Sequence, residues 1–345
     1  MRELTAGPST LPDTAAAWGG ADIWDGVRQS IRVMESVDRL SPSDVIRPLA
    51  PTLNEDLVSV IIPMRNAAKW IDLCLKGILA QTHSNLEVFC IDDCSSDDSY
   101  ERVVRRFGAD GRLGVVRLKR RVGPYQIKNW ALAAMVRASY VAMQDADDFS
   151  HPTRIAEQLG WMRAHGVRVC GTYVHQFSAD GTALIYGTQP PIPWRGQKHN
   201  LVRYAPIRAI RTPEDAGRVL GAGRFSLAKH GSQIFESALL REFGGFDGRT
   251  IMVGDTELNW RLLRFMDIGS VPSVLYARRI HADSLTRRPD TGYGSPARRA
   301  KRAEYDRRHE EISRSLDAGE TSRTRALCTQ DLFHGDVEVA DLHRA

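Results

Sequence analysis

Between residues 57 and 150, short apolar runs alternate with longer segments in which apolar residues recur at helical spacing. Each apolar run is five or six residues long, which is the length of an average strand. Strands that alternate with helices through short connections predict a parallel α/β sheet with right-handed crossovers. We expect strands at 58–62, 86–91, 113–118 and 140–144, and helices at 67–80, 95–107 and 124–138.

Acidic residues directly follow two of these strands. Asp92 and Asp93 come after the second strand, and Asp145, Asp147 and Asp148 come after the fourth. Ligands of open α/β sheets bind outside the carboxyl ends of the strands, so both groups should face one crevice.

Three carboxylates within residues 145–148 repel one another unless a cation neutralises them. Mg²⁺ and Mn²⁺ prefer oxygen ligands and commonly bind together with substrate phosphates. The alternative is a solvated acidic loop in which Asp148 or Ser150 caps the helix that begins near Pro152.

The composition excludes disordered and fibrous proteins, since 42% of the 345 residues are hydrophobic and 26% are charged. The formal net charge of +5 makes an anionic partner plausible. Five cysteines without a CxxC pair argue against a disulfide framework or a zinc site and favour a reducing cytoplasm. No apolar run approaches the roughly 18 residues that cross a bilayer.

Four segments occur in the order and spacing of one family. They are 58–66, 80–82, 87–98 and 144–149, the last followed by Pro152 and Arg154. Over residues 57–165 the chain resembles the family 2 glycosyltransferases. The resemblance implies a GT-A fold, a Rossmann-like and mostly parallel central sheet flanked by helices. It also implies a nucleotide-sugar donor, a divalent metal and inversion at the anomeric carbon.

The resemblance assigns the nucleotide-sugar site and one metal ligand, Asp147. Lys128 stands where the family usually has arginine, so the positive charge stays but the planar fork is lost. The turn 122–125 also departs from the family's glycine-rich form. The residues expected to bind the nucleotide sugar are Pro63, Arg65, Asp92, Asp93, Lys128, Asp145 and Ala146.

Segments 232–235, 240–247 and 254–262 resemble the family's acceptor side. There Gly254 replaces a glutamate, and Asp255 stands where the family has its general base, the group that takes the proton of the attacking hydroxyl. The alternative role of Asp255 is to cap the following helix.

Three further residues are candidates. Glu257 is either a second candidate for the base or an ordinary first-turn acid. Trp260 either stacks on an acceptor sugar or packs in the core. His281 resembles a His-x-x-Ser element that contacts the metal or the diphosphate; otherwise it is structural. Arg278 and Arg279 either neutralise the leaving group or form a solvated surface pair.

We expect four regions. Residues 1–56 form an N-terminal extension with a helix at 23–37, and residues 57–175 form the nucleotide-sugar half. Residues 176–290 form the acceptor half, with a hairpin at 173–186 and a selective loop at 190–211. Residues 291–345 form a charged helical extension, either solvated or in peripheral contact with the inner face of an anionic membrane.

The expected function is inverting transfer of a sugar from a nucleotide-diphosphate donor, UDP by family habit, with Mn²⁺ or Mg²⁺. The acceptor is a hydroxyl of a carbohydrate, lipid-linked glycan, protein or small molecule. One alternative is a sugar-phosphate nucleotidyltransferase, although residues 62–66 lack the glycine-rich loop of that class. Another is an inactive nucleotide-sugar-binding module, favoured by Gly254 and Lys128. Arginines interspersed with acids and no recognition motif argue against nucleic acid.

Overall fold

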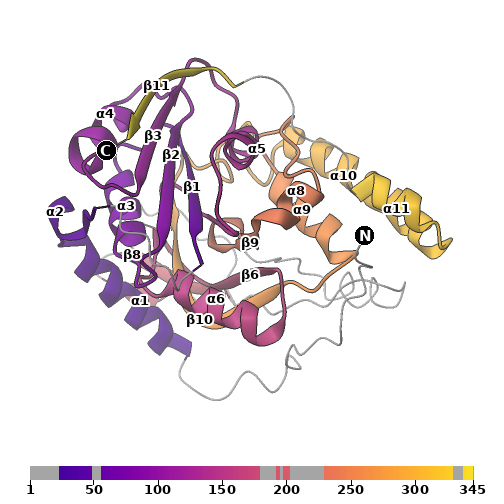
Figure 1. The fold of residues 1–345 in the computed structure, drawn as a ribbon. Coiled ribbons are helices and arrows are strands. Elements are labelled where there is room, and N and C mark those ends of the chain that lie inside the picture. The colour runs from indigo at the N-terminus through magenta and orange to yellow at the C-terminus, as the bar shows by residue number, and fades with distance from the viewer. Residues whose placement is uncertain are drawn as a thin grey trace.

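The computed structural model describes residues 23–48, 56–178, 192–194, 197–202, 229–328 and 337–344. These residues form one sheet with helices on both faces (Figure 1). The strand order is β11-β3-β2-β1-β4-β9-β6-β10-β5, and β8 pairs with both β6 and β7. The α/β fold class predicted from the sequence is confirmed.

The first half of the sheet is parallel. Strands β1 (Val58–Met64), β2 (Leu86–Asp92), β3 (Leu113–Leu118) and β4 (Tyr140–Met143) pair in the order β3-β2-β1-β4. The helices that connect and follow them are α3 (Ile71–Leu79), α4 (Ser99–Phe107), α5 (Pro124–Ala134) and α6 (Arg154–His165).

Both faces of these strands are covered, which explains why their sequences are apolar throughout instead of alternating. In β1, Val60 and Ile62 pack in one core with Leu75 of α3. Ile61 points to the other face and packs in a second core with Ile127 of α5.

The second half of the sheet is mixed. Strand β9 (Ile234–Glu236) joins antiparallel to both β4 and β6 (Val169–Ser178). Strand β10 (Gly269–Ile280) lies parallel to β6 and antiparallel to β5 (Phe149–Ser150). The remaining elements here are β7 (Ile192–Trp194), β8 (Gln197–Val202), η1 (His230–Ser232), α8 (Ser237–Glu242) and α9 (Gly254–Leu263).

The helix predicted in the N-terminal extension is α1 (Ile23–Asp38), and it packs on the second half of the sheet. Val27 and Ile31 contact Tyr173 and Leu201, while the C-terminal end of α1 packs near Phe177. The short helix α2 (Pro42–Val45) follows. The described part of the N-terminal extension therefore packs against the main domain.

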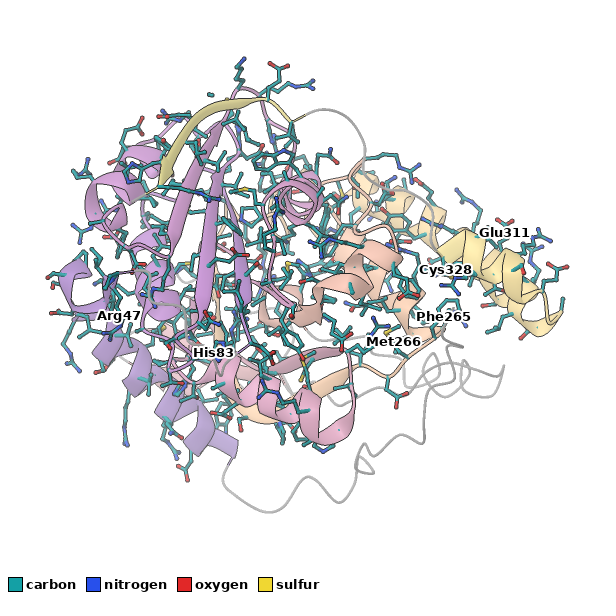
Figure 2. All side chains as sticks on the ribbon, in the orientation of Figure 1. Arg47, His83, Phe265, Met266, Glu311 and Cys328 are labelled. Carbon is teal, nitrogen blue, oxygen red and sulfur yellow. The ribbon has the colours of Figure 1, made fainter. Side chains whose placement is uncertain are left out.

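The charged C-terminal region forms α10 (Pro296–Asp317) and α11 (Thr321–Cys328), which pack together. Cys328 and Met266 share one core, with Phe265 packed against it, where α11 meets the end of α9 (Figure 2). The predicted helical extension over 291–345 is found in α10 and α11, and the end of the region differs. Val339–Arg344 forms β11, which pairs antiparallel with the otherwise open edge of β3.

Several boundaries differ from the prediction. Helix α3 begins at Ile71 instead of 67, after a turn in which Asn66 has a φ of 48°. Helix α5 ends at Ala134. The predicted hairpin and selective loop lie largely outside the described residues. No helix in the described ranges is long and apolar enough to cross a bilayer.

The capping alternative for the acidic loop is wrong. Thr153 occupies the N-cap position of α6 and makes no side-chain capping bond. Ser150 instead donates a hydrogen bond to the Gln144 side chain. Asp148 accepts one from the backbone N–H of Arg279.

Candidate functional site

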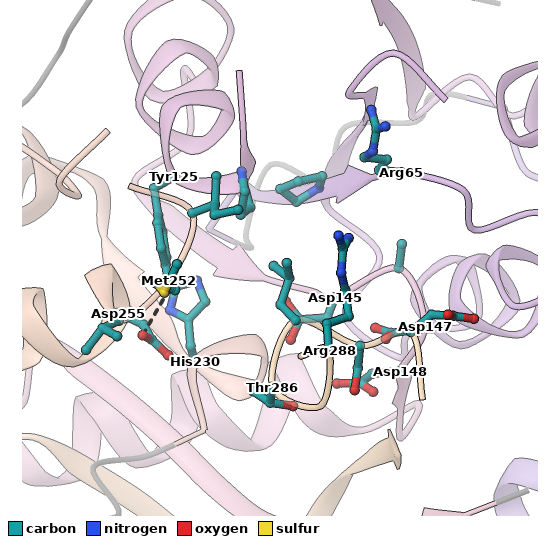
Figure 3. A pocket seen from close by; sticks show the side chains of 18 of the residues that line it. Arg65, Tyr125, Asp145, Asp147, Asp148, His230, Met252, Asp255, Thr286 and Arg288 are labelled. Carbon is teal, nitrogen blue, oxygen red and sulfur yellow. Dashed lines mark hydrogen bonds between the residues drawn. The ribbon is translucent and has the colours of Figure 1, made fainter. Parts of the chain in front are cut away.

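A cavity of about 730 Å³ opens at the carboxyl ends of β1, β2 and β4 (Figure 3). Its other walls come from the first turns of α5 and α9, from Lys229 and His230, and from the segment 278–302. The volume is within the usual range for small-molecule sites. The two acidic groups predicted to share a crevice therefore contribute Asp93, Asp145, Asp147 and Asp148 to one cavity.

Asp145 is neutralised by a lysine that the sequence reasoning missed. Lys229 Nζ lies 2.7 Å from Asp145 Oδ2. Burial by itself would raise the pKa of Asp145, but the charges of Lys229 and Lys128 hold that pKa below its usual value. Asp145 is thus a carboxylate with its own protein counter-ion.

Asp147 and His281, both candidate metal contacts, face each other. The distance between Asp147 Oδ2 and His281 Nε2 is 2.9 Å. Burial opposes the charge of His281, but the hydrogen bond with Asp147 outweighs it and raises the histidine pKa. Residues 134 positions apart in the sequence therefore meet at the cavity wall.

The third carboxylate of the cluster turns toward the backbone. Asp148 Oδ1 accepts a hydrogen bond from the Arg279 N–H at 2.8 Å. Burial and the adjacent charge of Asp147 raise the pKa of Asp148 to about 8. Across the described residues, no three His, Cys, Asp or Glu side chains converge as a metal site.

The pair Asp147 and His281 nevertheless fits a metal that arrives with substrate. Mg²⁺ is usually held by one or two carboxylates, several waters and substrate phosphates. Imidazole is an additional suitable ligand for transition metals. Two facing side chains at the cavity wall therefore match a substrate-borne cation better than a closed all-protein site.

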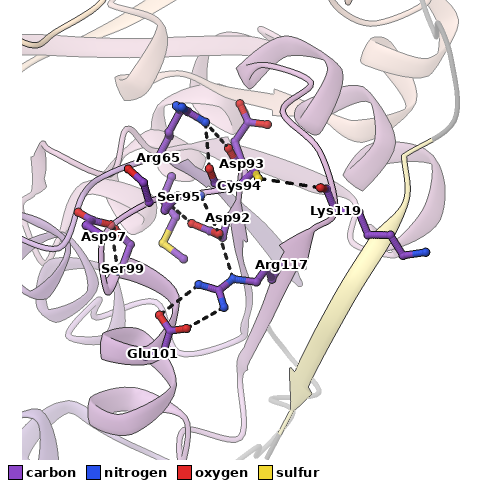
Figure 4. A network of polar contacts seen from close by, with 12 residues as sticks. Arg65, Asp92, Asp93, Cys94, Ser95, Asp97, Ser99, Glu101, Arg117 and Lys119 are labelled. Carbon is purple, nitrogen blue, oxygen red and sulfur yellow. Dashed lines mark hydrogen bonds and ion pairs between the residues drawn. The ribbon is translucent and has the colours of Figure 1, made fainter.

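On the wall formed by the ends of β1 and β2, Pro63, Arg65 and Asp93 line the cavity. The Asp93 carboxylate accepts hydrogen bonds from the backbone N–H groups of Val122 (2.7 Å) and Gly123 (3.0 Å). Burial raises the pKa of Asp93 despite these bonds. Arg65 donates to the carbonyl oxygens of Asp93 and Cys94 (Figure 4).

Asp92 is not part of the cavity lining, which corrects its assignment. Its carboxylate accepts hydrogen bonds from the Ser95 hydroxyl and N–H, and it lies 3.5 Å from Arg117 Nε (Figure 4). These contacts hold the Asp92 side chain away from the cavity, whereas Asp93, the first residue after β2, lines it. Asp92 shapes the loop that follows β2.

Lys128 and His230 form a second missed contact. Lys128 Nζ lies 2.6 Å from His230 Nε2, and both side chains line the cavity. Burial lowers the pKa of Lys128 to about 8 and that of His230 to about 3, so His230 is neutral and accepts the bond. The available signal was the pair Lys229-His230, just before the recognised segment 232–235.

Asp255 lies in the first turn of α9 and lines the cavity. Val253 occupies the N-cap position with a φ of 68°, so the capping alternative for Asp255 is wrong. Asp255 Oδ1 accepts a hydrogen bond from Tyr125 Oη at 3.0 Å (Figure 3). Burial would raise the pKa of Asp255, but the charge of Lys229 and the hydrogen bond from Tyr125 lower it.

Glu257 and Trp260 do not line the cavity, which corrects both acceptor assignments. Glu257 is fully buried, with Oε1 2.7 Å from Arg261 Nε and 3.1 Å from Arg308 Nη1. Trp260 is 8% exposed and packs in the core against His309. At 3.6 residues per turn these positions point about 160° and about 140° away from Asp255.

Arginines of the C-terminal region complete the rim. Arg298, Arg299 and Arg302 on the first two turns of α10 line the cavity, together with Arg288 and Arg278. Arg298 donates to the carbonyl oxygens of residues 291 and 285, and Arg299 to that of residue 294. The basic half of this helix therefore contributes positive charge to the cavity.

The segment that contains the parallel strands has a counterpart among known proteins. Residues 59–212 match the family model Glycosyl transferase family 2. This segment holds Pro63 through Asp147, so the resemblance seen in the sequence is confirmed there. Asp255 and His281 lie beyond the matched segment.

Curated relatives match between a third and two fifths of this chain. Glycosyltransferase GlyG of Streptococcus pneumoniae is 28% identical over 134 residues, which cover 39% of this chain and 44% of that protein. TuaG of Bacillus subtilis, a putative teichuronic acid biosynthesis glycosyltransferase, is 32% identical over 128 residues (37% and 50%). The chain spans about half the length, or less, of these relatives.

Among solved structures, Staphylococcus aureus TarS 1–349 in complex with UDP-GlcNAc aligns with a TM-score of 0.48 and 17% identity. That alignment covers 66% of this chain and 60% of TarS 1–349. The mannosyltransferase PcManGT of Pyrobaculum calidifontis, in complex with GDP-Man and Mn²⁺, has a TM-score of 0.47 and 18% identity. It covers 85% of this chain and 72% of that one.

Proposed function

We propose that this protein is a glycosyltransferase of the family 2 type, which transfers a sugar from a nucleoside-diphosphate donor to an acceptor hydroxyl. The observation that carries the proposal is one cavity shared by the strand-end aspartates of the family-matched segment and by Asp255 of α9. The alternative of a nucleotidyltransferase is disfavoured by residues 62–66, which lack the glycine-rich loop of that class.

The donor occupies the wall formed by β1, β2 and α5. Pro63, Arg65 and Asp93 flank the base and ribose, with Ala146 and Asp145 beside them. UDP is the expected nucleotide because the family resemblance favours it. Asp93 accepts two bonds from the loop 122–123, one on each oxygen, and its remaining lone pairs can accept hydrogen bonds from the nucleotide.

Asp255 is the general base. It accepts the proton of the acceptor hydroxyl while the hydroxyl oxygen bonds to the anomeric carbon. The bond between that carbon and the diphosphate oxygen breaks on the opposite face, so the configuration inverts and the electron pair leaves with the nucleoside diphosphate. The lowered pKa keeps Asp255 ionised at neutral pH, as a base must be.

The leaving diphosphate is stabilised by positive charge around the cavity. Lys229, Arg278 and Arg279 line the wall near the aspartate cluster. Asp147 and His281 would hold a divalent cation, Mn²⁺ or Mg²⁺, on the donor phosphates. When bound, such a cation supplies further charge stabilisation to the departing oxygen.

The test is donor turnover. The purified protein is incubated with a panel of nucleotide sugars and with simple acceptor glycosides, with and without Mn²⁺, and released nucleoside diphosphate is measured. We expect release with UDP-sugars that depends on the metal and falls about a hundredfold or more in Asp147→Ala, since a metal contributes several kcal/mol. Exposed Asp306→Ala is the matched control.

Two results would contradict the proposal. Formation of inorganic diphosphate from a nucleoside triphosphate and a sugar phosphate would identify a nucleotidyltransferase instead. Tight donor binding in calorimetry without turnover on any acceptor, and without donor hydrolysis, would identify a binding module.

A further inference from the structure

The two departures from the family pattern, the turn at 122–125 and glycine at position 254, lie against each other in the structure. We propose that Tyr125 is a positioning residue for Asp255 and that Gly254 is required because the Tyr125 ring fills the space beside it. The inference rests on the proposed function, in which Asp255 is the general base.

Tyr125 is held firmly in place. It lies in the first turn of α5 and is 7% exposed. Its ring stacks on Phe246, with centroids 5.7 Å apart and planes at 20°, and it meets the edge of His230 at 6.3 Å. With the ring fixed on two sides, Tyr125 Oη has one orientation from which to donate to Asp255 Oδ1.

Gly254 makes this contact sterically possible. A Cβ at position 254 would lie 2.9 Å from Tyr125 Cδ2 and 3.0 Å from Cε2, closer than carbon atoms approach in proteins. Both ring atoms belong to a packed aromatic side chain that cannot swing aside. Any larger residue at 254 would therefore push Tyr125 away from Asp255 or displace the first turn of α9.

The segment 122–125 and the turn before α9 also touch at a second point. A Cβ on Gly123, whose φ is 91°, would lie 2.6 Å from Ile251 Cγ2. Between these contacts Val253 adopts a φ of 68°, an unfavourable conformation for a β-branched residue that persists only where neighbours impose it. The turn that presents Asp255 is therefore shaped by its fit against the segment 123–125.

That segment is itself anchored on the donor side. The N–H groups of Val122 and Gly123 donate to the carboxylate of Asp93. A continuous set of contacts thus runs from Asp93, through the start of α5 and Tyr125, to Asp255. The position of Asp255 therefore depends on Tyr125, which lies 130 residues earlier in the sequence.

Tyr125 can only donate to Asp255. Burial, followed by the charge of Asp255, raises the tyrosine pKa well above its usual value, so the phenol keeps its proton. The other charged or titratable groups that act on this pair are Lys128, Lys229, His230 and Arg298. The phenol bond favours the ionised carboxylate and fixes the direction from which it accepts a proton.

The test is Tyr125→Phe, which keeps the ring and removes the hydroxyl. A hydrogen bond to a charged group is worth about 1.5–3 kcal/mol, so we expect kcat for sugar transfer to fall about ten- to a hundredfold. The donor KM should stay within twofold. The acidic limb of the kcat profile should move to higher pH, because Asp255 loses a bond that favours its charged form.

Tyr305→Phe is the matched control. Tyr305 Oη also donates to a buried carboxylate, Asp247 Oδ2 at 2.9 Å, but neither residue lines the cavity. The control should lower the unfolding temperature while leaving kcat and the acidic limb unchanged. Equal kinetic effects in both variants would show a merely structural role and overturn the inference.

A second variant tests the steric part. Gly254→Ala should lower kcat at least tenfold in the wild type but less than twofold in a Tyr125→Ala background, where the ring is absent. Equal losses in both backgrounds overturn the inference, as does full activity of Tyr125→Phe in an active enzyme. Failure of the wild type to turn over any donor instead overturns the proposed function, and this inference with it.

Discussion

The two halves of the cavity are built by different means. On the nucleotide side, Asp93, Asp145 and Asp147 follow strands that pair in parallel, so the sheet itself brings them to one edge. On the other side, Asp255 and His281 come from a helix start and from the loop after β10. Their positions depend on contacts between distant segments and on buried ion pairs.

The difference predicts where substitutions are costly. In the parallel half, substitutions that lower the rate should change the free energy of unfolding little, because the hydrogen bonds between strands keep the site residues in place. In the other half, removing one buried partner should disturb several elements at once. The following substitutions test that contrast, from the largest effect to the smallest.

Asp255→Asn should have the largest effect on rate. The amide cannot accept the acceptor's proton, and general bases contribute about 10²- to 10⁴-fold, so kcat should fall by that factor. Donor affinity, measured by calorimetry, should change less than threefold, because the nucleotide side is built by the sheet. A fall in donor affinity that matches the fall in kcat would contradict this separation.

Glu257→Gln should have the largest effect on stability. Glu257 and Arg261 are both fully buried and paired, and Arg308 also reaches Glu257. Removing the carboxylate charge leaves buried guanidinium groups without compensation, which typically costs about 3–5 kcal/mol. Denaturant unfolding should show this loss in the free energy of unfolding.

The ion pair to compare in the parallel half is Arg102 with Asp72. Arg102 Nη2 on α4 lies 2.8 Å from Asp72 Oδ2 on α3. These side chains are 31% and 18% exposed, so Asp72→Asn should cost roughly 1 kcal/mol. A cost equal to that of Glu257→Gln would remove the contrast between the halves.

The sequence predicted the parallel half well because each step there is local. Apolar runs of strand length and helical spacing identify β1 to β4 with their helices, and a strand end determines where the next side chains lie. Even so, Asp92 was misassigned, because its carboxylate bonds to Ser95 in the loop after β2 and only Asp93 lines the cavity.

In the other half, local pattern was a poor guide. Glu257 and Trp260 share a motif with Asp255 but face other directions on α9. Lys229, His230 and Tyr125 belong to no charged or acidic cluster, and only the tertiary fold brings them together. The arginines of α10 show the same limit, because their helix was predictable and its docking on the cavity was not.

Acid should weaken the C-terminal half in a specific way. Burial would raise the pKa of Asp247, but hydrogen bonds from Arg249 and Tyr305 lower it to about 2, against about 3.9 unfolded. This contribution to stability is present above pH 4 and disappears as the pH falls toward 2. It is worth on the order of 2 kcal/mol.

The measurement compares wild type with Asp247→Asn by denaturant unfolding at pH 7, 4 and 2.5. The advantage of the wild type should shrink by about 2 kcal/mol over this interval, since the variant has no carboxylate to protonate. If the difference in the free energy of unfolding stays constant with pH, the Asp247 carboxylate does not stabilise the packing of α10 on the loop after α8.

The smallest effect should come from the ion pair between the end of β3 and the segment that leads into β11. Lys119 Nζ lies 3.4 Å from Glu338 Oε2, with the side chains 58% and 53% exposed. Pairs of this kind contribute less than about 1 kcal/mol and are screened by salt. Lys119→Ala should therefore leave the amide protection of β3 unchanged, since the backbone ladder with β11 persists. Loss of protection in β3 at low salt would show that even the regular half depends on a side-chain contact at its edge.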